Sequence, residues 1–143
     1  MNLEEFVKLD EELDLLCLPE SEKEKKLIQV IDLFKFVECL SSSIEIINYA
    51  DDDINIIKNK GLKAGIIFCD NLHFIHFNCN YQKIQFFKNK YQLDEIWFVY
   101  VLELNTDYSQ KNIQHYIQKY NLQKYYNRTF LFNFFGSDLS EIK

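Results

Sequence analysis

The sequence has few residues that bend or interrupt a chain, since its 143 residues include only 3 glycines and 1 proline. Glycine-rich phosphate loops, collagen-like repeats and long irregular loops are therefore not expected. No apolar run approaches the roughly 18 residues of a membrane-spanning helix. The first five residues include two glutamates and no basic residue, whereas a signal peptide begins with basic residues, so we expect a cytoplasmic protein with no membrane association.

The composition that remains is that of a globular protein. Apolar residues make up 48%, aromatic residues 16% and charged residues 27% of the chain. A chain of 143 residues is long enough to bury one sizeable core but short for two domains. We therefore predict a single domain over 1–143, in which an N-terminal helical pair at 1–41 packs on an α/β core at 42–136.

The net charge of −6 is concentrated near the N-terminus. Residues 1–24 carry nine acidic and two basic side chains, a net charge of −7, and the other 119 residues sum to +1. Such a segment repels nucleic acid and attracts a basic protein surface. A solvated helix face that keeps an aromatic-rich protein in solution would have the same composition, so the charge leaves both interpretations open.

Hydrophobic periodicity and, within 51–58, the three capping aspartates Asp51–Asp53 predict helices in five places. They cover 3–17, 22–41, one or two turns within 51–58, a segment from Asn80 to about 91, and a long segment after Asn105-Thr106. Ser21 and Glu24 form a capping-box sequence at the start of the second helix, and Asn80 is a capping residue for the fourth.

Runs of β-branched and aromatic residues predict five strands, at 44–47, 64–69, 72–78, 95–102 and 129–135. Asp70-Asn71 separates the second run from the third and is a good two-residue hairpin turn. The run at 95–102 is almost entirely apolar, which suits a central strand covered on both faces. The predicted fold class is therefore α/β, a mixed sheet flanked by helices with two helices at the N-terminus.

Four side chains of zinc-ligand type, Cys69, His73, His76 and Cys79, lie within eleven residues. On a strand the two histidines would face opposite sides of the sheet, and the tight Cys-x-x-Cys turn of zinc sites is missing. We therefore expect neither a metal nor a cofactor. A nucleophilic pair of Cys69 or Cys79 with His115 is not excluded by the spacing, although buried structural cysteines are commoner.

A basic and aromatic stretch occupies the C-terminal third of the chain. Lysine and arginine alternate there with tyrosine, which suits phosphate contacts and base stacking on a single nucleic-acid strand. The candidate nucleic-acid contacts are Lys119, Lys124, Arg128 and Tyr125. Two neighbouring tyrosines, Tyr116 and Tyr120, equally well complete the core stripe of the predicted helix.

Within 61–102 an apolar strand at 64–68, a second predicted strand, a helix and another apolar strand follow one another, after a helix and a strand. This order resembles the α-β-β-β-α-β core of the restriction-endonuclease-like (PD-(D/E)xK) superfamily. In that resemblance Gly65 takes the position of the metal-binding aspartate, and His76 and Asn78 take those of Glu and Lys in Glu-x-Lys. Without two carboxylates and a lysine, Mg²⁺ is not held and water is not activated. The resemblance therefore implies a non-catalytic copy that serves as a binding scaffold.

Three classes of function follow from these patterns. The first is a small acidic protein-binding module, such as an immunity protein or antitoxin that inhibits a basic, nuclease-type toxin. Its candidate partner-binding residues are the acidic side chains of the first predicted helix: Glu4, Glu5, Glu11, Glu12 and Asp14. The second is an inactive nuclease-like domain that binds nucleic acid or acts in a larger complex. The third is a small enzyme with an unrecognised site.

Overall fold

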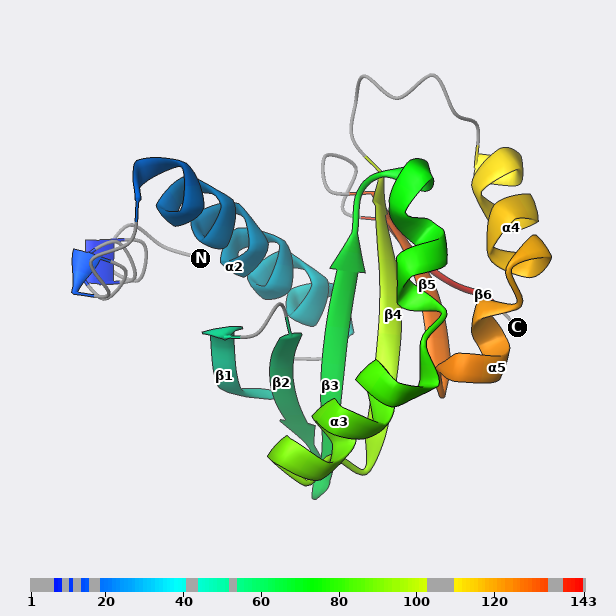
Figure 1. Ribbon diagram of the computed structural model, residues 1–143. Coiled ribbons are helices and arrows are strands. Elements are labelled where there is room, and N and C mark those ends of the chain that lie inside the picture. Colours follow the sequence, from blue (N-terminus) through cyan, green and yellow to red (C-terminus); the bar gives the residue numbers. More distant parts are fainter. Residues whose placement is uncertain are drawn as a thin grey trace.

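A six-stranded mixed sheet forms the centre of the protein, with helices on both of its faces (Figure 1). The strands lie in chain order across the sheet. The three strands in its middle run parallel to one another, and all other neighbours are antiparallel. The computed structural model describes residues 7, 8, 11, 14, 15, 19–40, 44–51, 54–102, 110–133 and 138–142. The predicted fold class is confirmed.

The strands are β1 (Glu45–Asp51), β2 (Ile54–Asn59), β3 (Leu62–Cys69), β4 (Glu95–Leu102), β5 (Arg128–Asn133) and β6 (Asp138–Ile142). The helices are α2 (Glu20–Leu40), the 3-10 helix η1 (Leu72–Asn78), α3 (Tyr81–Tyr91), α4 (Gln110–Lys119) and α5 (Leu122–Tyr125). Among the described residues there is no helix with the length and apolarity needed to cross a membrane.

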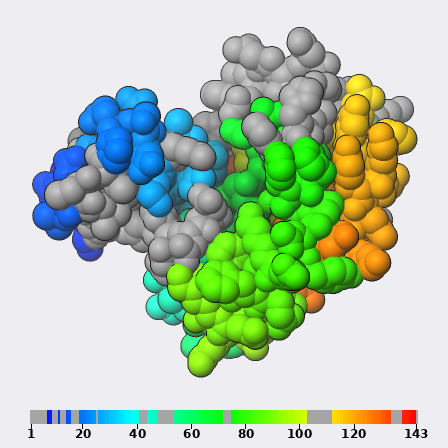
Figure 2. Space-filling model, in the orientation of Figure 1, coloured from blue at the N-terminus to red at the C-terminus, as the bar shows by residue number. Residues whose placement is uncertain are grey.

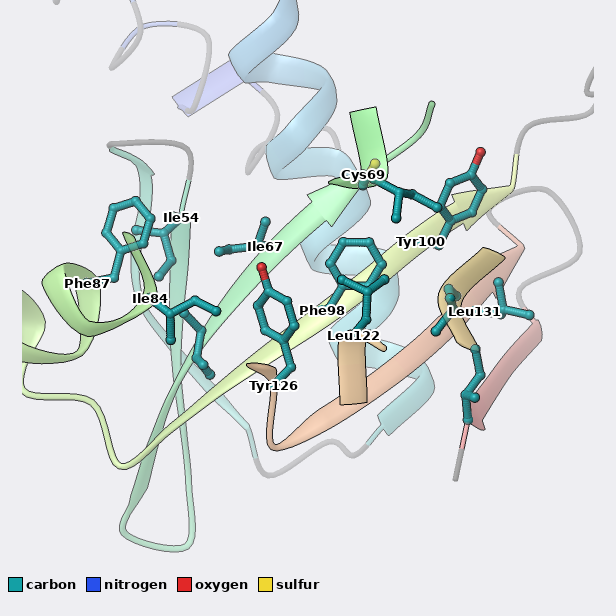
Figure 3. Packing of buried hydrophobic residues seen from close by; sticks show 14 of the residues in the cluster. Ile54, Ile67, Cys69, Ile84, Phe87, Phe98, Tyr100, Leu122, Tyr126 and Leu131 are labelled. Atoms are coloured by element: carbon teal, nitrogen blue, oxygen red, sulfur yellow. The ribbon is translucent and has the colours of Figure 1, made fainter. Parts of the chain in front are cut away.

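The central strand β4 separates two hydrophobic cores. Its side chains alternate, so Trp97 and Val99 pack with α2 on one face, while Phe98 and Tyr100 pack with the other helices (Figure 3). All six residues from Ile96 to Val101 are buried. The prediction of a central strand at 95–102 covered on both faces is confirmed.

Two side chains align the amino ends of the parallel strands. The backbone N–H of Lys63 donates to Asp94 Oδ2 at 2.9 Å, and that of Ile96 donates to Asn127 Oδ1 at 2.9 Å. Because β3, β4 and β5 run in the same direction, their carboxyl ends all lie at the opposite edge of the sheet. In open sheets of this kind that edge is where binding sites form.

The helical turns predicted within 51–58 are wrong, because residues Ile54–Asn59 form the strand β2. Ile54, Ile56 and Ile57 are all buried in the sheet, and β-branched side chains pack well there. The hairpin turn is Lys60-Gly61, with positive φ angles of 52° and 85°. Two consecutive left-handed residues suit the twist of a two-residue hairpin.

The predicted hairpin between 64–69 and 72–78 is also wrong. The strand β3 pairs with β2 along one edge and with β4 along the other, so no edge is left for a third partner. Residues Leu72–Asn78 form η1 instead. Ile75 and Asn78 are buried while the two residues between them are exposed, which is the three-residue repeat of a 3-10 helix.

The remaining predictions concern the helices and the C-terminal strands. Asn80 caps α3, where its side chain accepts hydrogen bonds from the N–H groups of Gln82 and Lys83. The helix α2 begins at Glu20, so Ser21 lies inside it and is not the cap that the sequence predicts. The strand β5 confirms the prediction at 129–135 as far as residue 133, and β6 was not predicted. Most of the first predicted helix lies outside the described residues.

Candidate functional site

The helices on the two faces of the sheet differ in charge. On one face η1, α3, α4 and α5 form what we call the lysine-rich layer. These four elements contain six lysines and neither aspartate nor glutamate: Lys83, Lys88, Lys90, Lys111, Lys119 and Lys124. The helix α2 on the other face carries five acidic and four basic side chains. The layer is thus a positive surface on a protein whose net charge is −6.

The lysine-rich layer is held on the sheet by buried apolar side chains. They include Ile75 of η1, Ile84 and Phe87 of α3, Ile113 and Ile117 of α4, and Leu122 of α5. Polar contacts join the elements as well: the thiol of Cys79 donates to the Tyr120 carbonyl at 3.5 Å, and the Tyr126 hydroxyl donates to the Asn78 carbonyl at 2.9 Å. The elements form one continuous surface in Figure 2, green for η1 and α3 and yellow to orange for α4 and α5.

Aromatic rings lie among these lysines in two groups. In the first, the rings of Tyr81 and Tyr125 are 4.5 Å apart between centroids, and Lys124 Nζ is 5.9 Å from the Tyr81 centroid. Tyr81 begins α3 and is 52% exposed, which is a large fraction for an aromatic side chain. Tyr125 is half-buried at the end of α5. The pair brings together two helices that are more than 30 residues apart in the sequence.

The second group joins η1 to α4. His76 contacts Phe77 at 4.0 Å and Tyr120 at 6.4 Å between ring centroids. Tyr120 lies nearly parallel to Tyr116, and Lys119 Nζ is 5.8 Å from the centroid of each. Phe77 is 59% exposed. Among the described residues, no carboxylate forms an ion pair with Lys119 or Lys124, so their charges face solvent.

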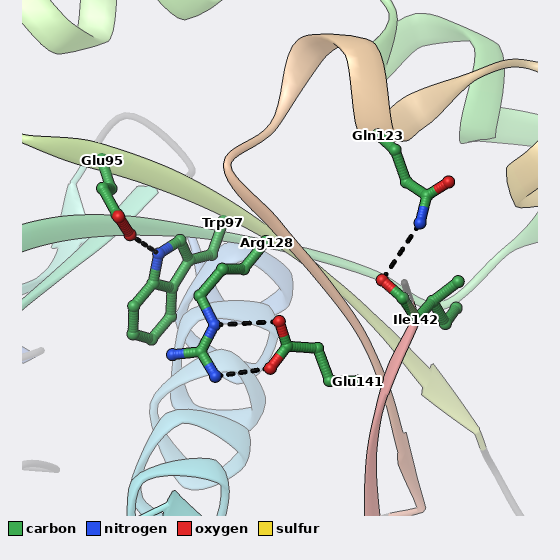
Figure 4. Close-up of polar contacts among 6 residues, drawn as sticks. All are labelled: Glu95, Trp97, Gln123, Arg128, Glu141 and Ile142. Atoms are coloured by element: carbon green, nitrogen blue, oxygen red, sulfur yellow. Dashed lines mark hydrogen bonds and ion pairs between the residues drawn. The ribbon is translucent and has the colours of Figure 1, made fainter.

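The structure brings together three of the four nucleic-acid candidates predicted from the sequence. Lys119, Lys124 and Tyr125 all belong to the lysine-rich layer, but Arg128 does not. The Arg128 guanidinium lies over Trp97 on the α2 face, 4.7 Å from the ring centroid, and donates to Glu141 at 2.6 and 3.2 Å (Figure 4). This ion pair raises the pKa of Arg128 and connects β5 to β6.

Sequence reasoning missed the contribution of η1 and α3, which supply Phe77, Tyr81 and Lys83. These residues are some 40 positions away from α4 and α5, and only the fold places them side by side. One signal is present in the sequence: residues 71–93 and 108–137 contain no aspartate or glutamate. Two acid-free stretches of this kind would have identified both halves of the layer.

A cleft of about 500 Å³ lies beside the layer, at the carboxyl ends of β3 and β4. The first half of α2 forms one wall, and η1 with the start of α3 forms another. Its charged lining residues are Glu24, Asp32, Asp70 and Lys83. Sequence reasoning treated Asp70 as a turn residue and did not place α2 near it. The sequence offered no signal for that contact, because it depends on how α2 crosses the sheet.

The carboxylates of the cleft do not form a metal centre with the other described residues. No group of three histidine, cysteine, aspartate or glutamate side chains among them is placed to hold a metal ion. The three positions matched to the nuclease motif also have different surroundings. A Cβ at Gly65 would be 2.6 Å from Leu93 Cδ1 and 2.7 Å from Ile54 Cδ1, so this position packs in the core, whereas His76 is exposed on η1.

Cys69 lines the cleft but is a protonated thiol. Burial raises its pKa to about 11, an effect that a backbone hydrogen bond of Asn71 only partly offsets. The thiol itself donates to the Asn71 carbonyl at 3.3 Å, which suits its protonated form. Burial raises the pKa of Cys79 too. His115 is exposed and packs edge-on against Tyr116, and no contact joins it to either thiol in the part of the chain that the structure describes. The Cys–His pair that the spacing did not exclude is therefore not assembled among the described residues.

We expect iodoacetamide to alkylate Cys69 at pH 8 at least about tenfold more slowly in the folded protein than in the unfolded chain. The thiolate is the reactive form, and a pKa near 11 leaves little of it at that pH. Quantifying the modified Cys69 peptide by mass spectrometry over time gives both rates. Equal rates would mean that a thiolate forms in the cleft, and a nucleophilic enzyme would then have to be reconsidered.

Of the acidic residues predicted to bind a partner, Glu4, Glu5 and Glu12 lie outside the described residues. Glu11 and Asp14 are exposed. The Asp14 carboxylate pairs with Lys23 Nζ of α2 at 2.6 Å. This contact links the acid-rich N-terminal stretch to the side of the molecule on which α2 lies.

No family model, no curated protein and no solved structure matches this chain. The functional argument therefore rests on the geometry and charge of its own residues.

Proposed function

We propose that this chain is a non-catalytic domain on a restriction-endonuclease-like scaffold that binds single-stranded nucleic acid through its lysine-rich layer. The observation that carries the proposal is the coincidence, on one face, of five lysines and several accessible aromatic rings, with no acidic residue in the described helices of that face. Sequence-tolerant binding to single strands uses this combination, in which cations contact phosphates and aromatic rings stack with bases.

The order of elements supports the scaffold. The helix α2, the strands β1, β2 and β3, the helix α3 and the strand β4 follow one another as α-β-β-β-α-β. The positions that the sequence matches to Glu-x-Lys lie on η1, and the third strand of this order is β3, which the sequence matches to the aspartate-bearing strand. Its sequence from Leu62 to Cys69 contains no carboxylate, so the catalytic motif is missing from this position as well. The chain then retains the scaffold without the acid that would hold Mg²⁺.

The charge of the layer supports a polyanionic ligand. Lys83 and Lys88 are half-buried, and Lys90, Lys119 and Lys124 are exposed, on helices without a single acidic side chain. A phosphate backbone is the ligand whose affinity grows with each such cation, because each contact releases condensed counterions. The acid-rich N-terminal stretch would repel the same backbone and thereby confine it to this face.

The exposed rings favour a single strand over a duplex. Phe77 and Tyr81 are more than half exposed, and it costs free energy to keep aromatic surface in contact with water. A base can stack on such a ring only when that base is unstacked from the neighbouring bases. Bases in single strands and loops are in this state. In a duplex the bases are stacked and only their edges are accessible.

A labelled single strand of about 12 nucleotides is expected to bind at low salt with an affinity that falls linearly on a log–log plot as salt rises. The double variant Lys119→Gln/Lys124→Gln should reduce the slope of that plot by about 1.4, since each phosphate contact contributes about 0.7. Tyr81→Ala should weaken binding by about 1 to 3 kcal/mol through lost stacking and leave the salt slope unchanged. Fluorescence anisotropy at several KCl concentrations measures both quantities.

The matched control is Lys58→Gln/Lys60→Gln, which removes two exposed lysines at the β2–β3 hairpin, outside the layer. It should reproduce the wild-type affinity and slope. The proposal is wrong if the wild-type protein does not bind at low salt. It is also wrong if the control and the layer variant lose the same affinity, which would indicate attraction by overall charge alone.

A further inference from the structure

We infer that the cleft between α2 and the carboxyl end of β3 is a docking groove for a basic partner protein, and that it takes a segment with lysine or arginine next to a large apolar side chain. This inference goes beyond nucleic-acid binding, since it concerns the cleft beside the lysine-rich layer and a ligand of opposite charge. The cleft shares Phe77 and Lys83 with that layer. The acidic N-terminal stretch led us to expect a basic partner, and this cleft would be the place where that partner binds.

The shape of the cleft indicates an apolar ligand group. Its apolar lining includes Ile67 and Phe68 at the end of β3 and Val101 at the end of β4. Two large side chains from different elements lie in its lining while they remain mostly exposed: Ile28 of α2 at 58% and Phe77 of η1 at 59%. An apolar side chain of a partner that enters between them would remove both from water.

The charge of the cleft indicates that the ligand is cationic. Glu24 and Asp32 come from α2 and Asp70 follows β3, whereas Lys83 is the only basic residue among the described residues that line the cleft. These charges sum to −2 at neutral pH, so a phosphate group would be repelled. An ammonium or guanidinium group would be attracted and would donate charge-assisted hydrogen bonds to these carboxylates.

The ligand of the cleft must carry both an apolar group and a positive charge. A metal ion would satisfy the carboxylates, but these residues are not placed to coordinate one and the apolar lining would stay exposed. A small polyamine lacks the bulky apolar group that Ile28 and Phe77 would cover. A protein segment with a basic residue beside an aliphatic or aromatic residue provides both, and interfaces commonly use such residues as their central anchors.

Further acidic residues lie near the cleft on its α2 side, whereas the wall formed by η1 and α3 belongs to the lysine-rich layer. Glu20 and Glu22 are exposed on the first turn of α2, just before the lining residue Glu24. Asp14 is tied to α2 through Lys23, so the acid-rich stretch continues from this end of the helix. The acidic side chains at this end of α2 would attract a basic protein, and that attraction weakens as salt is added.

The test uses a fluorescein-labelled peptide of about 12 residues in which arginine and lysine alternate with leucine and phenylalanine. Glu24→Gln/Asp70→Asn removes two exposed carboxylates of the cleft and should weaken binding about tenfold or more. Ile28→Ser should weaken binding by a similar factor through loss of the apolar contact. Anisotropy titration at low salt measures each affinity, and circular dichroism confirms that each variant is folded.

Matched controls remove the same groups elsewhere. Glu45→Gln/Asp138→Asn takes two exposed carboxylates from the edge strands, and Ile47→Ser shortens an isoleucine of β1 that is 44% exposed. Both should bind the peptide as the wild-type protein does, and so should Lys119→Gln/Lys124→Gln. That last result makes the test independent of nucleic-acid binding by the lysine-rich layer.

Three results would overturn the inference. The first is a peptide affinity that neither cleft variant changes, and the second is equal affinity for a peptide in which glutamate replaces every basic residue. The third is a wild-type protein that does not bind the peptide but self-associates in sedimentation, with self-association lost in Ile28→Ser. In that case the groove would bind a second copy of the chain instead of a basic partner.

Discussion

Replacing Phe36 with alanine is expected to lower the free energy of unfolding by about 3 to 5 kcal/mol. Phe36 is fully buried where α2 crosses the sheet. Its ring meets those of Phe68, Phe130 and Phe132 edge-on, at centroid distances of 5.9, 5.3 and 6.0 Å. The substitution removes all three contacts and leaves a cavity between helix and sheet. Small domains are stable by only about 5 to 15 kcal/mol, so this loss is a large fraction of the total.

Urea unfolding followed by circular dichroism and by fluorescence measures the loss. The chain has one tryptophan, Trp97, and it lies in the same core as Phe36, so its emission reports on this face of the sheet. The matched control is Phe86→Ala on α3, where the ring is 56% exposed and the expected loss is below about 1 kcal/mol. A loss that small for Phe36→Ala, or a separate early transition of helical signal, would show that α2 does not unfold together with the sheet.

The parts of the fold that could be predicted are those in which a local pattern coincides with the final environment. The run at 95–102 is apolar at almost every position, and only a strand covered on both faces buries all of it. Asn80 is followed by apolar residues at helical spacing, and a capped helix follows there. Neither conclusion needs knowledge of which element packs against which.

The wrong predictions of secondary structure concern segments whose sequence pattern fits either a helix or a strand. Tertiary packing decides which of the two forms. Leu72–Asn78 has the apolar content of a strand, but both edges of its expected partner β3 are occupied, and η1 forms instead. The region before Lys60-Gly61 begins with three aspartates that suggest a helix start. Its isoleucines are nevertheless buried on both faces of the sheet as β2, and burial outweighs the local capping signal.

The candidate site was predictable only in part, for a similar reason. Lys119, Lys124 and Tyr125 are close in sequence, and α4 and α5 keep them close in space. Arg128 is equally close in sequence, yet it begins a strand whose side chains alternate, and it therefore faces the α2 side and Glu141. Tyr81 joins the site from another helix through its contact with Tyr125, which only the complete fold provides.

Replacing Tyr126 with alanine is the second substitution expected to cost about 3 to 5 kcal/mol. Tyr126 is 4% exposed between α5 and β5, and its ring lies 5.4 Å from that of Phe98 between centroids (Figure 3). Its hydroxyl donates to the Asn78 carbonyl at the end of η1. The side chain therefore contributes to the core and also holds two parts of the lysine-rich layer together.

Tyr126→Phe separates these two contributions, because it keeps the ring and removes the hydroxyl. The Asn78 carbonyl would lose this donor, and we expect the free energy of unfolding to fall by about 1 to 3 kcal/mol. Alkaline pH offers a second measurement. Burial raises the pKa of Tyr126 well above its usual value, so the native phenol stays protonated while the unfolded one ionises near pH 10. The unfolded state then binds fewer protons than the native state, and stability falls as pH rises above 10.

Urea unfolding at pH 8 and at pH 10.5 gives the change in the free energy of unfolding between the two pH values for each protein. Subtracting the change in Tyr126→Phe from that in the wild-type protein leaves the contribution of the Tyr126 phenol. The wild-type protein should lose more stability between the two pH values than Tyr126→Phe does. Hydrogen exchange of η1 amides should be faster in Tyr126→Phe than in the wild-type protein, since the contact to Asn78 is gone. Unchanged exchange in η1, together with equal pH dependence, would show that the hydroxyl contact does not hold the layer on the sheet.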